Sequence, residues 1–228
     1  MKILAIDTAT EACSAALYLD GEIHQQYRVA PREHSHLILP MIEQLLAESE
    51  NRVSNLDAIA FGRGPGSFMG VRIAAGVAQG IAFARDLPVV PVSTLAAIAQ
   101  TACAISGAEK VLSAIDARMH EVYWAACELD VQGCMRITGR ECVIAPDQVP
   151  GPRGSGWTGA GSGWSAYAET LTAALGEGIV SAQLEACFPT AEAIVRLAVA
   201  DYGAGAYVSA AQALPVYLRD KVARKSTA

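Results

Sequence analysis

Two aspartates are the side chains best placed to do chemistry. Asp7 follows the apolar run Lys2–Ile6, and Asp116 ends a similar run that begins at Lys110. Runs of this kind predict strands, and open α/β sheets bind ligands beyond the carboxyl ends of their strands. Both carboxylates are therefore candidates for a site. The alternative is that each one only caps the polar turn that follows it.

The second aspartate has a charged neighbour. Arg118 lies two residues after Asp116, which is close enough for a local ion pair within the expected turn Ala117–Met119. We expect the Asp116 and Arg118 turn to act structurally or at a contact, and not in catalysis.

A glycine-rich turn between a strand and a helix is the next candidate. Leu56–Phe61 predicts a buried strand, and a helix should run from a cap at Ser67 to about Arg85. Free amides at such a helix start favour an anion. However, a Walker loop needs a lysine after its last glycine, and none follows Gly66. We therefore favour a structural turn over a phosphate loop. The turn consists of Gly64, Pro65, Gly66 and Ser67.

The helix after this turn carries two glycines on one stripe. Gly76 and Gly80 lie four residues apart, one turn beyond Arg72, and no charged residue stands between Arg72 and Arg85. Each glycine costs a helix roughly 1 kcal/mol relative to alanine. We expect another backbone to approach this stripe closely and offset that cost. It belongs either to the chain's own sheet or to a second helix.

The remaining reactive side chains form no catalytic constellation. His34 and His36 complete no familiar metal motif, so we interpret them as surface histidines. The six cysteines include no C-x-x-C pair and are interpreted as small buried thiols. The serines beside glycines do not fit the G-x-S-x-G nucleophile motif. We therefore expect no catalytic residue and no metal.

The composition fits a packed α/β protein that does not grip nucleic acid by itself. Of the 228 residues, 52% are hydrophobic and 18% are charged, and the formal net charge is −6. Phosphate contacts need a concentrated basic surface, so any link to RNA should come through a partner. Only four apolar residues separate Lys2 from Asp7, which fits neither a signal peptide nor a membrane span. A cytoplasmic location is expected.

The order of the predicted elements positions these candidates. The chain begins with a meander of three strands and continues with an amphipathic helix, Leu37–Glu48. After the central strand and helix come a strand at Val89–Val92 and a helix that starts after Ser93 or Thr94. The apolar face of the first helix consists of Leu37, Ile38, Met41, Ile42, Leu45 and Leu46.

The pattern then starts again with a second meander from Lys110. This recurrence predicts two related α/β lobes, residues 1–106 and 107–228. The segment 146–163 is rich in proline, glycine and serine and is interpreted as a loop region. A final helix at about 190–202 is placed to pack back on the first lobe. The basic residues near the end are interpreted as solvated; they are Lys221, Arg224 and Lys225.

Several segments, in order along the whole chain, resemble the TsaB (YeaZ) family. They are ILAIDTATEACSAAL, HSHLILPMIEQLL, IAFGRGPGSFMGVRIAAGVAQGIA, PVVPVSTLAAIA, AIDARMHEVYWAAC and the closing PVYLR. The resemblance implies a two-lobed actin/Hsp70-like (ASKHA, RNase H-like) α/β fold with a reduced second lobe. It also implies a cytoplasmic bacterial protein needed to form N6-threonylcarbamoyladenosine beside the anticodon of tRNAs.

In that pathway the transfer is carried out by TsaD, a catalytic relative, with TsaE as ATPase. The resemblance implies a non-catalytic partner and activator of TsaD. Such a protein contacts TsaE through the TsaB–TsaD complex, contacts tRNA indirectly and contacts no membrane. A homodimer is possible when the chain is alone. In the family, the first and central helices pair with their counterparts on TsaD or on a second TsaB. The competing interpretation buries both helix faces in the chain's own core. The implied interface residues are Leu37, Ile38, Met41, Ile42, Leu45, Arg72, Gly76 and Gly80.

The chain departs from its catalytic relatives at two places. TsaD-like proteins carry histidine metal ligands after the corresponding strand, where this chain has Thr94 and Ile98. Nucleotide binders of this fold often use D-x-G-[ST], whereas Asp7, Thr8 and Thr10 surround an alanine. These three residues are the weak candidates for a nucleotide, and the resemblance otherwise leaves a nucleotide only at the contact with TsaD. Two alternatives are kept. One is a small-molecule phosphotransferase of the same fold, and the other is a protease, which the missing nucleophile disfavours.

Overall fold

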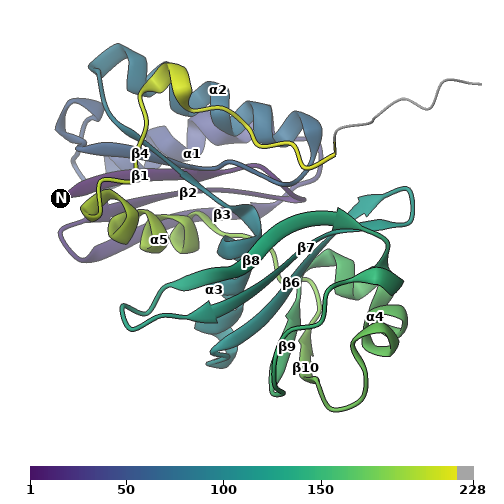
Figure 1. The fold of residues 1–228 in the computed structure, drawn as a ribbon. Helices are drawn as coiled ribbons and strands as arrows, with labels where there is room; N and C mark the ends of the chain where they lie inside the picture. Colours follow the sequence, from purple (N-terminus) through teal and green to yellow (C-terminus); the bar gives the residue numbers. More distant parts are fainter. Residues whose placement is uncertain (220–228) are drawn as a thin grey trace, which may run out of the picture.

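The computed structural model describes residues 1–219 and shows two lobes joined through packed helices (Figure 1). The basic residues Lys221, Arg224 and Lys225 lie outside the described residues. Within residues 1–219, every helix is too short or too polar to cross a bilayer.

The first lobe is built on a five-stranded sheet of order β3-β2-β1-β4-β5. Strand β1 runs antiparallel to β2 and parallel to β4, so the meander lies on one side of β1 and the parallel strands on the other. Its elements are β1 (Lys2–Asp7), β2 (Ala12–Leu19), β3 (Glu22–Val29), α1 (His34–Glu48), η1 (Val53–Asn55), β4 (Ala58–Gly62), α2 (Phe68–Arg85), β5 (Val89–Val92) and α3 (Thr94–Ser106).

The second sheet repeats this order as β10-β9-β6-β7-β8, again with a meander on one side of its first strand and parallel strands on the other. The predicted recurrence is confirmed, and the chain has the two-lobed ASKHA type of α/β fold. The elements are β6 (Lys110–Arg118), β7 (Glu121–Leu129), β8 (Met135–Ile144), η2 (Pro146–Gln148), β9 (Trp157–Ala160), α4 (Ser162–Leu175), β10 (Val180–Leu184), α5 (Ala191–Gly203) and η3 (Ala210–Gln212).

Helices cover both faces of the first sheet, which explains why its strands other than the edge strand β3 are largely apolar along their whole length. Alternate residues of β1 point to opposite sides, with Leu4 and Ile6 in the core beneath α1 and α2. Ile3 and Ala5 point instead to the core beneath α5. Figure 1 shows α5 on the opposite face of this sheet from α1 and α2.

The last helix of each lobe packs on the sheet of the other lobe. Helix α3 follows β5 but packs against β6, β7 and β8, whereas α5 follows β10 but packs against β1, β2 and β4. The N-terminus of α5 is fixed in place because the amides of Ala191 and Glu192 donate to Ser14 Oγ and Gln25 Oε1, at 2.9 and 2.8 Å. Each lobe therefore contributes one helix that packs on the sheet of the other lobe.

The second lobe is reduced in helices and not in strands. The connection from β3 to β4 contains α1, whereas the equivalent connection from β8 to β9 contains only η2. The prediction that 146–163 is a loop region is wrong, because this segment contains η2, the strand β9 and the start of α4. The glycines of this segment suggested a loop. However, a Cβ atom on Gly159 would lie 2.5 Å from the Trp164 ring, so this glycine allows the ring to pack closely on the strand.

Candidate functional site

The first candidate site, at the end of β1, is buried. Asp7 has no exposed surface; its Oδ2 accepts a hydrogen bond of 3.3 Å from the Ala9 amide, and its Oδ1 has no partner among the described residues. Burial raises the pKa of Asp7 to about 8, while the hydrogen bond from Ala9 lowers it in part. The carboxyl group is therefore held mainly in its neutral form near pH 7.

Glycines of the adjoining segment allow the backbone to close over this turn. A Cβ atom on Gly62 would lie 2.0 Å from Asp7 Oδ1, and one on Gly70 would lie 2.0 Å from the carbonyl oxygen of Thr8. At Gly66 it would lie 2.4 Å from the carbonyl oxygen of Ala9. A side chain at Gly66 or Gly70 would force the β1 turn and the start of α2 apart, and one at Gly62, the last residue of β4, would displace the Asp7 carboxyl group.

Hydrogen bonds hold the two segments in this contact. The Ser67 amide donates to the Ala9 carbonyl at 2.7 Å, and the Thr8 hydroxyl donates to the Gly70 carbonyl at 2.6 Å. Ser67 also caps α2, as predicted, because its Oγ accepts from the Gly70 amide at 3.4 Å. The turn's amide and hydroxyl groups are thus used within the chain.

This arrangement corrects the nucleotide hypothesis for the β1 turn. Asp7 and Thr8 have no exposed surface and Thr10 is 8% exposed, so none of the three presents a surface to a nucleotide. The Gly64, Pro65, Gly66 and Ser67 turn packs on the β1 turn instead of surrounding an open space. Gly64 adopts a φ of +100°, and a Cβ atom there would lie 2.9 Å from the carbonyl oxygen of Val216.

The start of α3 holds Thr94 and Ile98, the two residues at which the resemblance predicts that metal ligands are missing. Thr94 and Ile98 are buried, and Ser93 caps the helix by accepting from the amides of Leu95 and Ala96. Within residues 1–219, His, Cys, Asp and Glu side chains nowhere gather in groups of three or more that could hold a metal ion.

A partly buried ion pair connects the lobes beside Ser93. The Arg63 guanidinium pairs with Glu141 Oε2, and the Ser93 hydroxyl donates to Glu141 Oε1. The Glu141 side chain is only 11% exposed. A register shift in β8 between the partners of Trp124 and Ala126 places Glu141 here. Sequence reasoning missed this group, because no local pattern joins residues so far apart along the chain.

The Asp116 turn lies at the surface. Asp116 Oδ1 accepts from the Arg118 amide, and its Oδ2 pairs with the Arg118 guanidinium, both at 2.8 Å. The Arg118 side chain is 78% exposed. Strand β6 runs through to Arg118, so the turn lies one or two residues later than expected, at Met119 and His120. The pair stabilises the start of the hairpin between β6 and β7.

The predicted interface on α1 needs correction at three residues. Ile38, Ile42 and Leu45 are at most 4% exposed and belong to the core between α1, α2 and the sheet. They cannot contact a partner without unfolding this layer. Leu37 and Met41 are half-buried at the edge of the same core and keep some surface.

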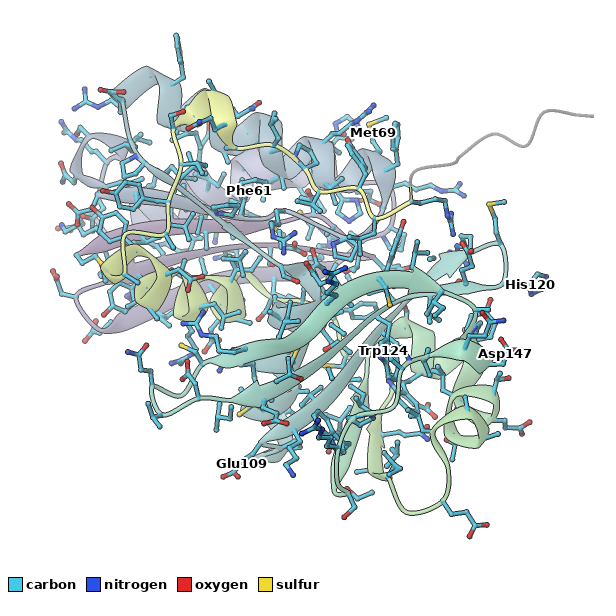
Figure 2. The ribbon with its side chains drawn as sticks, in the orientation of Figure 1. Phe61, Met69, Glu109, His120, Trp124 and Asp147 are labelled. Carbon is cyan, nitrogen blue, oxygen red and sulfur yellow. The ribbon has the colours of Figure 1, made fainter. Side chains whose placement is uncertain are left out.

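Helix α2 exposes an apolar and glycine-containing face. Around Gly76 and Gly80 a Cβ atom would meet nothing within 4 Å, so these glycines do not accommodate the chain's own sheet. Figure 2 shows Met69 on the outer side of α2, while Phe61 lies in the interior. We call the exposed set of Phe68, Met69, Arg72, Gly76, Gly80 and Phe83 the α2 stripe.

Exposed aromatic residues of this surface were not predicted. Phe68 is 56% exposed and Phe83 is 84% exposed, while Tyr217 packs on Phe68 from the C-terminal segment. The available signal was that α2 is apolar or small on nearly all sides, which leaves an apolar face after the sheet has been covered. Which face remains open depends on the tertiary contacts.

Comparisons with known proteins agree with this geometry. A family model described as "TsaD: tRNA N6-adenosine threonylcarbamoyltransferase" matches residues 16–225. The tRNA threonylcarbamoyladenosine biosynthesis protein TsaB of Escherichia coli is 44% identical over 234 residues, covering 99% of this chain and 97% of that protein. The protein of the same description in Haemophilus influenzae is 40% identical over 233 residues, covering 99% and 96%.

A solved structure described as YeaZ from Pseudomonas aeruginosa has a TM-score of 0.90 and 48% sequence identity, covering 95% of this chain and 99% of that chain. The similarity therefore extends over both lobes. On this evidence the chain belongs to the TsaB (YeaZ) family of tRNA threonylcarbamoyladenosine biosynthesis proteins.

Proposed function

We propose that the chain is the non-catalytic partner that binds and activates a TsaD transferase during formation of N6-threonylcarbamoyladenosine in tRNA. The observation that carries the proposal is the α2 stripe, an exposed helix face without a carboxylate and with two glycines at its centre. Membership of the TsaB family indicates the pathway, and the α2 stripe is the surface through which the chain would act in it.

The stripe has the properties of a helix-docking surface. Contiguous exposed apolar patches on a soluble protein mark interaction sites. The two glycines cost the isolated helix roughly 2 kcal/mol relative to alanine. A Cβ atom at either position would meet nothing within 4 Å, so no close approach within the described chain offsets this cost. A partner helix crossing at Gly76 and Gly80 would gain close backbone contact, with Leu37 and Met41 of α1 at the edge of the interface.

The other parts of the chain fit an auxiliary role. The net charge of −6 is unfavourable for holding tRNA directly, so tRNA and TsaE are reached through the transferase. Without the transferase, the same stripe would serve an isologous dimer of the chain. The alternative of a small-molecule phosphotransferase gains no support from the buried Asp7 turn.

Reconstitution of tRNA modification tests the proposal. Purified TsaD, TsaE and the enzyme that makes threonylcarbamoyl-adenylate would be mixed with tRNA, with and without this chain, and the modified nucleoside measured by mass spectrometry. We expect modification only when the chain is present, and no ATP hydrolysis by the chain alone. The Asp7→Asn variant should support as much modification as the unaltered chain, because Asp7 is buried. Equal modification without the chain would contradict the proposal.

A further inference from the structure

We propose that Arg72 is the polar anchor of the α2 stripe, held ready by Tyr217 of the C-terminal segment, and that it pairs with a carboxylate on the facing helix of the transferase. This inference rests on the proposed function and adds the chemistry of the partner surface. It also assigns a role to Tyr217 of the C-terminal segment.

Aromatic contacts fix the position of Arg72. Its guanidinium carbon lies 3.7 Å from the centre of the Phe68 ring, and its Nε donates to Tyr217 Oη at 2.8 Å. The Phe68 and Tyr217 rings contact each other, with centroids 5.9 Å apart and planes inclined by 39°. Guanidinium groups stack favourably on aromatic faces. The side chain is thus ordered before a partner arrives, which lowers the entropy cost of binding.

The segment that carries Tyr217 is itself attached to both lobes. On one side of Tyr217, the Val216 amide donates to the carbonyl of Arg63 at 2.8 Å. On the other side, Arg219 pairs with Glu121 and donates to the carbonyl of Arg118 at 3.4 Å in the second lobe. Tyr217 is therefore a fixed support for Arg72.

The donors that remain on Arg72 define the partner's chemistry. Among residues 1–219 its only hydrogen bond is the one from Nε, so both terminal nitrogens are available. Their planar geometry matches a carboxylate, which can accept two parallel hydrogen bonds. Phe68 and Tyr217 cover part of the guanidinium, and the α2 stripe offers no competing charge. A pair formed here would be shielded from water and stronger than an exposed ion pair.

The composition of α2 favours the transferase over a second copy of the chain. Residues Phe68–Arg85 contain no aspartate or glutamate. An isologous pairing of α2 with α2 would therefore give Arg72 no carboxylate from the facing helix. A different protein with an acidic residue on its helix would satisfy it.

Binding of the full-length chain to purified TsaD, measured by calorimetry at low salt, tests the inference. We expect Arg72→Glu to weaken binding at least about 30-fold, because it places like charges opposite each other. Arg72→Lys should weaken binding about tenfold, because lysine cannot form the paired hydrogen bonds. Tyr217→Phe, which removes only the hydroxyl, should weaken it about threefold through loss of orientation.

Arg85→Glu is the matched control, since it reverses an exposed arginine at the other end of the same helix, and it should bind within about twofold of the unaltered chain. All variants should melt as the unaltered chain does, to within a few degrees. One lysine substitution among the acidic residues of the transferase helix should restore binding of Arg72→Glu. That rescue would not occur if Arg72 served only the structure of this chain.

Three outcomes would overturn the inference. If Arg72→Glu binds the transferase normally while Gly76→Leu does not, Arg72 is not the anchor, but the proposal that α2 docks on the transferase is kept. If Arg72→Glu instead dissociates a dimer of this chain and leaves transferase binding unchanged, the anchor serves self-association. If the unaltered chain does not bind the transferase, the proposed function and this inference both fail.

Discussion

Asp7 and Asp116 occupy equivalent places in the two lobes, at or near the end of the first strand of each sheet, yet their environments differ. Asp7 is fully buried, with one carboxylate oxygen unpartnered among the described residues. Asp116 is paired with the highly exposed Arg118. Strand order and residue type are the same in both places, so neither determines what the carboxylate does.

The difference arises from where the following helix begins to touch the first strand. In the first lobe, Gly66 and Gly70 press on the residues that follow Asp7, and the carboxyl group is enclosed. In the second lobe, the start of α4 presses on Ala114, which precedes the aspartate: a Cβ atom on Gly161 would lie 2.3 Å from the Ala114 carbonyl oxygen, and one on Gly163 would lie 2.7 Å from the Ala114 Cβ atom. The Asp116 amide still donates to Ser162 Oγ at the start of α4, at 3.1 Å, but the Asp116 carboxyl group is not enclosed and its side chain keeps 17% of its surface exposed.

The largest expected effect is that of separating the two segments over Asp7. Gly70→Ala should destabilise the protein by roughly 3 kcal/mol, because the Cβ atom would collide with the Thr8 backbone and displace the turn. Gly76→Ala is the matched control on the same helix and should stabilise the protein by up to about 1 kcal/mol. Urea unfolding of both variants measures the difference. Equal stability of the two would contradict the close contact at Gly70.

The second prediction concerns the pH dependence of stability that Asp7 causes. Burial raises its pKa from the ordinary value of 3.8 to about 8, so between these pH values the folded protein retains a proton that the unfolded chain has lost. The contribution of Asp7 to stability is therefore complete below about pH 4, falls as the pH rises, and levels off above about pH 8. Between pH 6 and pH 8 the loss should be about 2 kcal/mol.

Comparison with Asp7→Asn isolates this contribution, because the amide resembles the neutral acid and does not titrate. The free energy of unfolding of the unaltered chain, minus that of the variant, should decrease from pH 6 to pH 8. Cys13 does not add to the slope, because burial, and to a lesser degree Asp7, raise its pKa to about 12. A difference that stays constant over this range would show that Asp7 is already ionised at pH 6.

The smallest effect belongs to Asp116, the counterpart in the second lobe, whose side chain is 17% exposed. Asp116→Ala should cost about 1 kcal/mol or less, since it removes one turn hydrogen bond and an ion pair with a highly exposed partner. Arg118→Ala removes only the ion pair and should cost less still. Tests of tRNA modification should find at most a modest loss for both variants. Complete loss with unchanged folding and transferase binding would give Asp116 a chemical role.

Local patterns predicted the elements whose signals lie within one segment. The cap at Ser67, the helix to Arg85 and the strand Val89–Val92 are confirmed, because each has its own capping residue or apolar period. The final helix expected at about 190–202 is also confirmed, and it runs from Ala191 to Gly203 with Thr190 as its cap. The duplicated meander was also visible, since both copies keep the order of strand, turn and strand.

The failures share one physical cause, which is contact between distant segments. Strand β9 is short and contains a glycine, so it looked like a loop until its partners β6 and β10 were known. The apolar face of α1 looked available, although Ile38, Ile42 and Leu45 are used by the core. Of the two alternatives for Gly76 and Gly80, contact with the chain's own sheet is wrong, and in the first lobe Gly62, Gly66 and Gly70 make the close internal contacts instead.

The most direct test of the account is Gly76→Leu, examined by thermal melting and in the reconstituted modification reaction. Gly76 faces open space in this chain, so leucine should leave the melting temperature unchanged or raise it, by up to about 1 kcal/mol of added stability. The bulky side chain should nevertheless block the approach of the partner helix and abolish both transferase binding and tRNA modification. A variant that melts normally and still supports full modification would contradict the central claim that the chain acts through the α2 stripe.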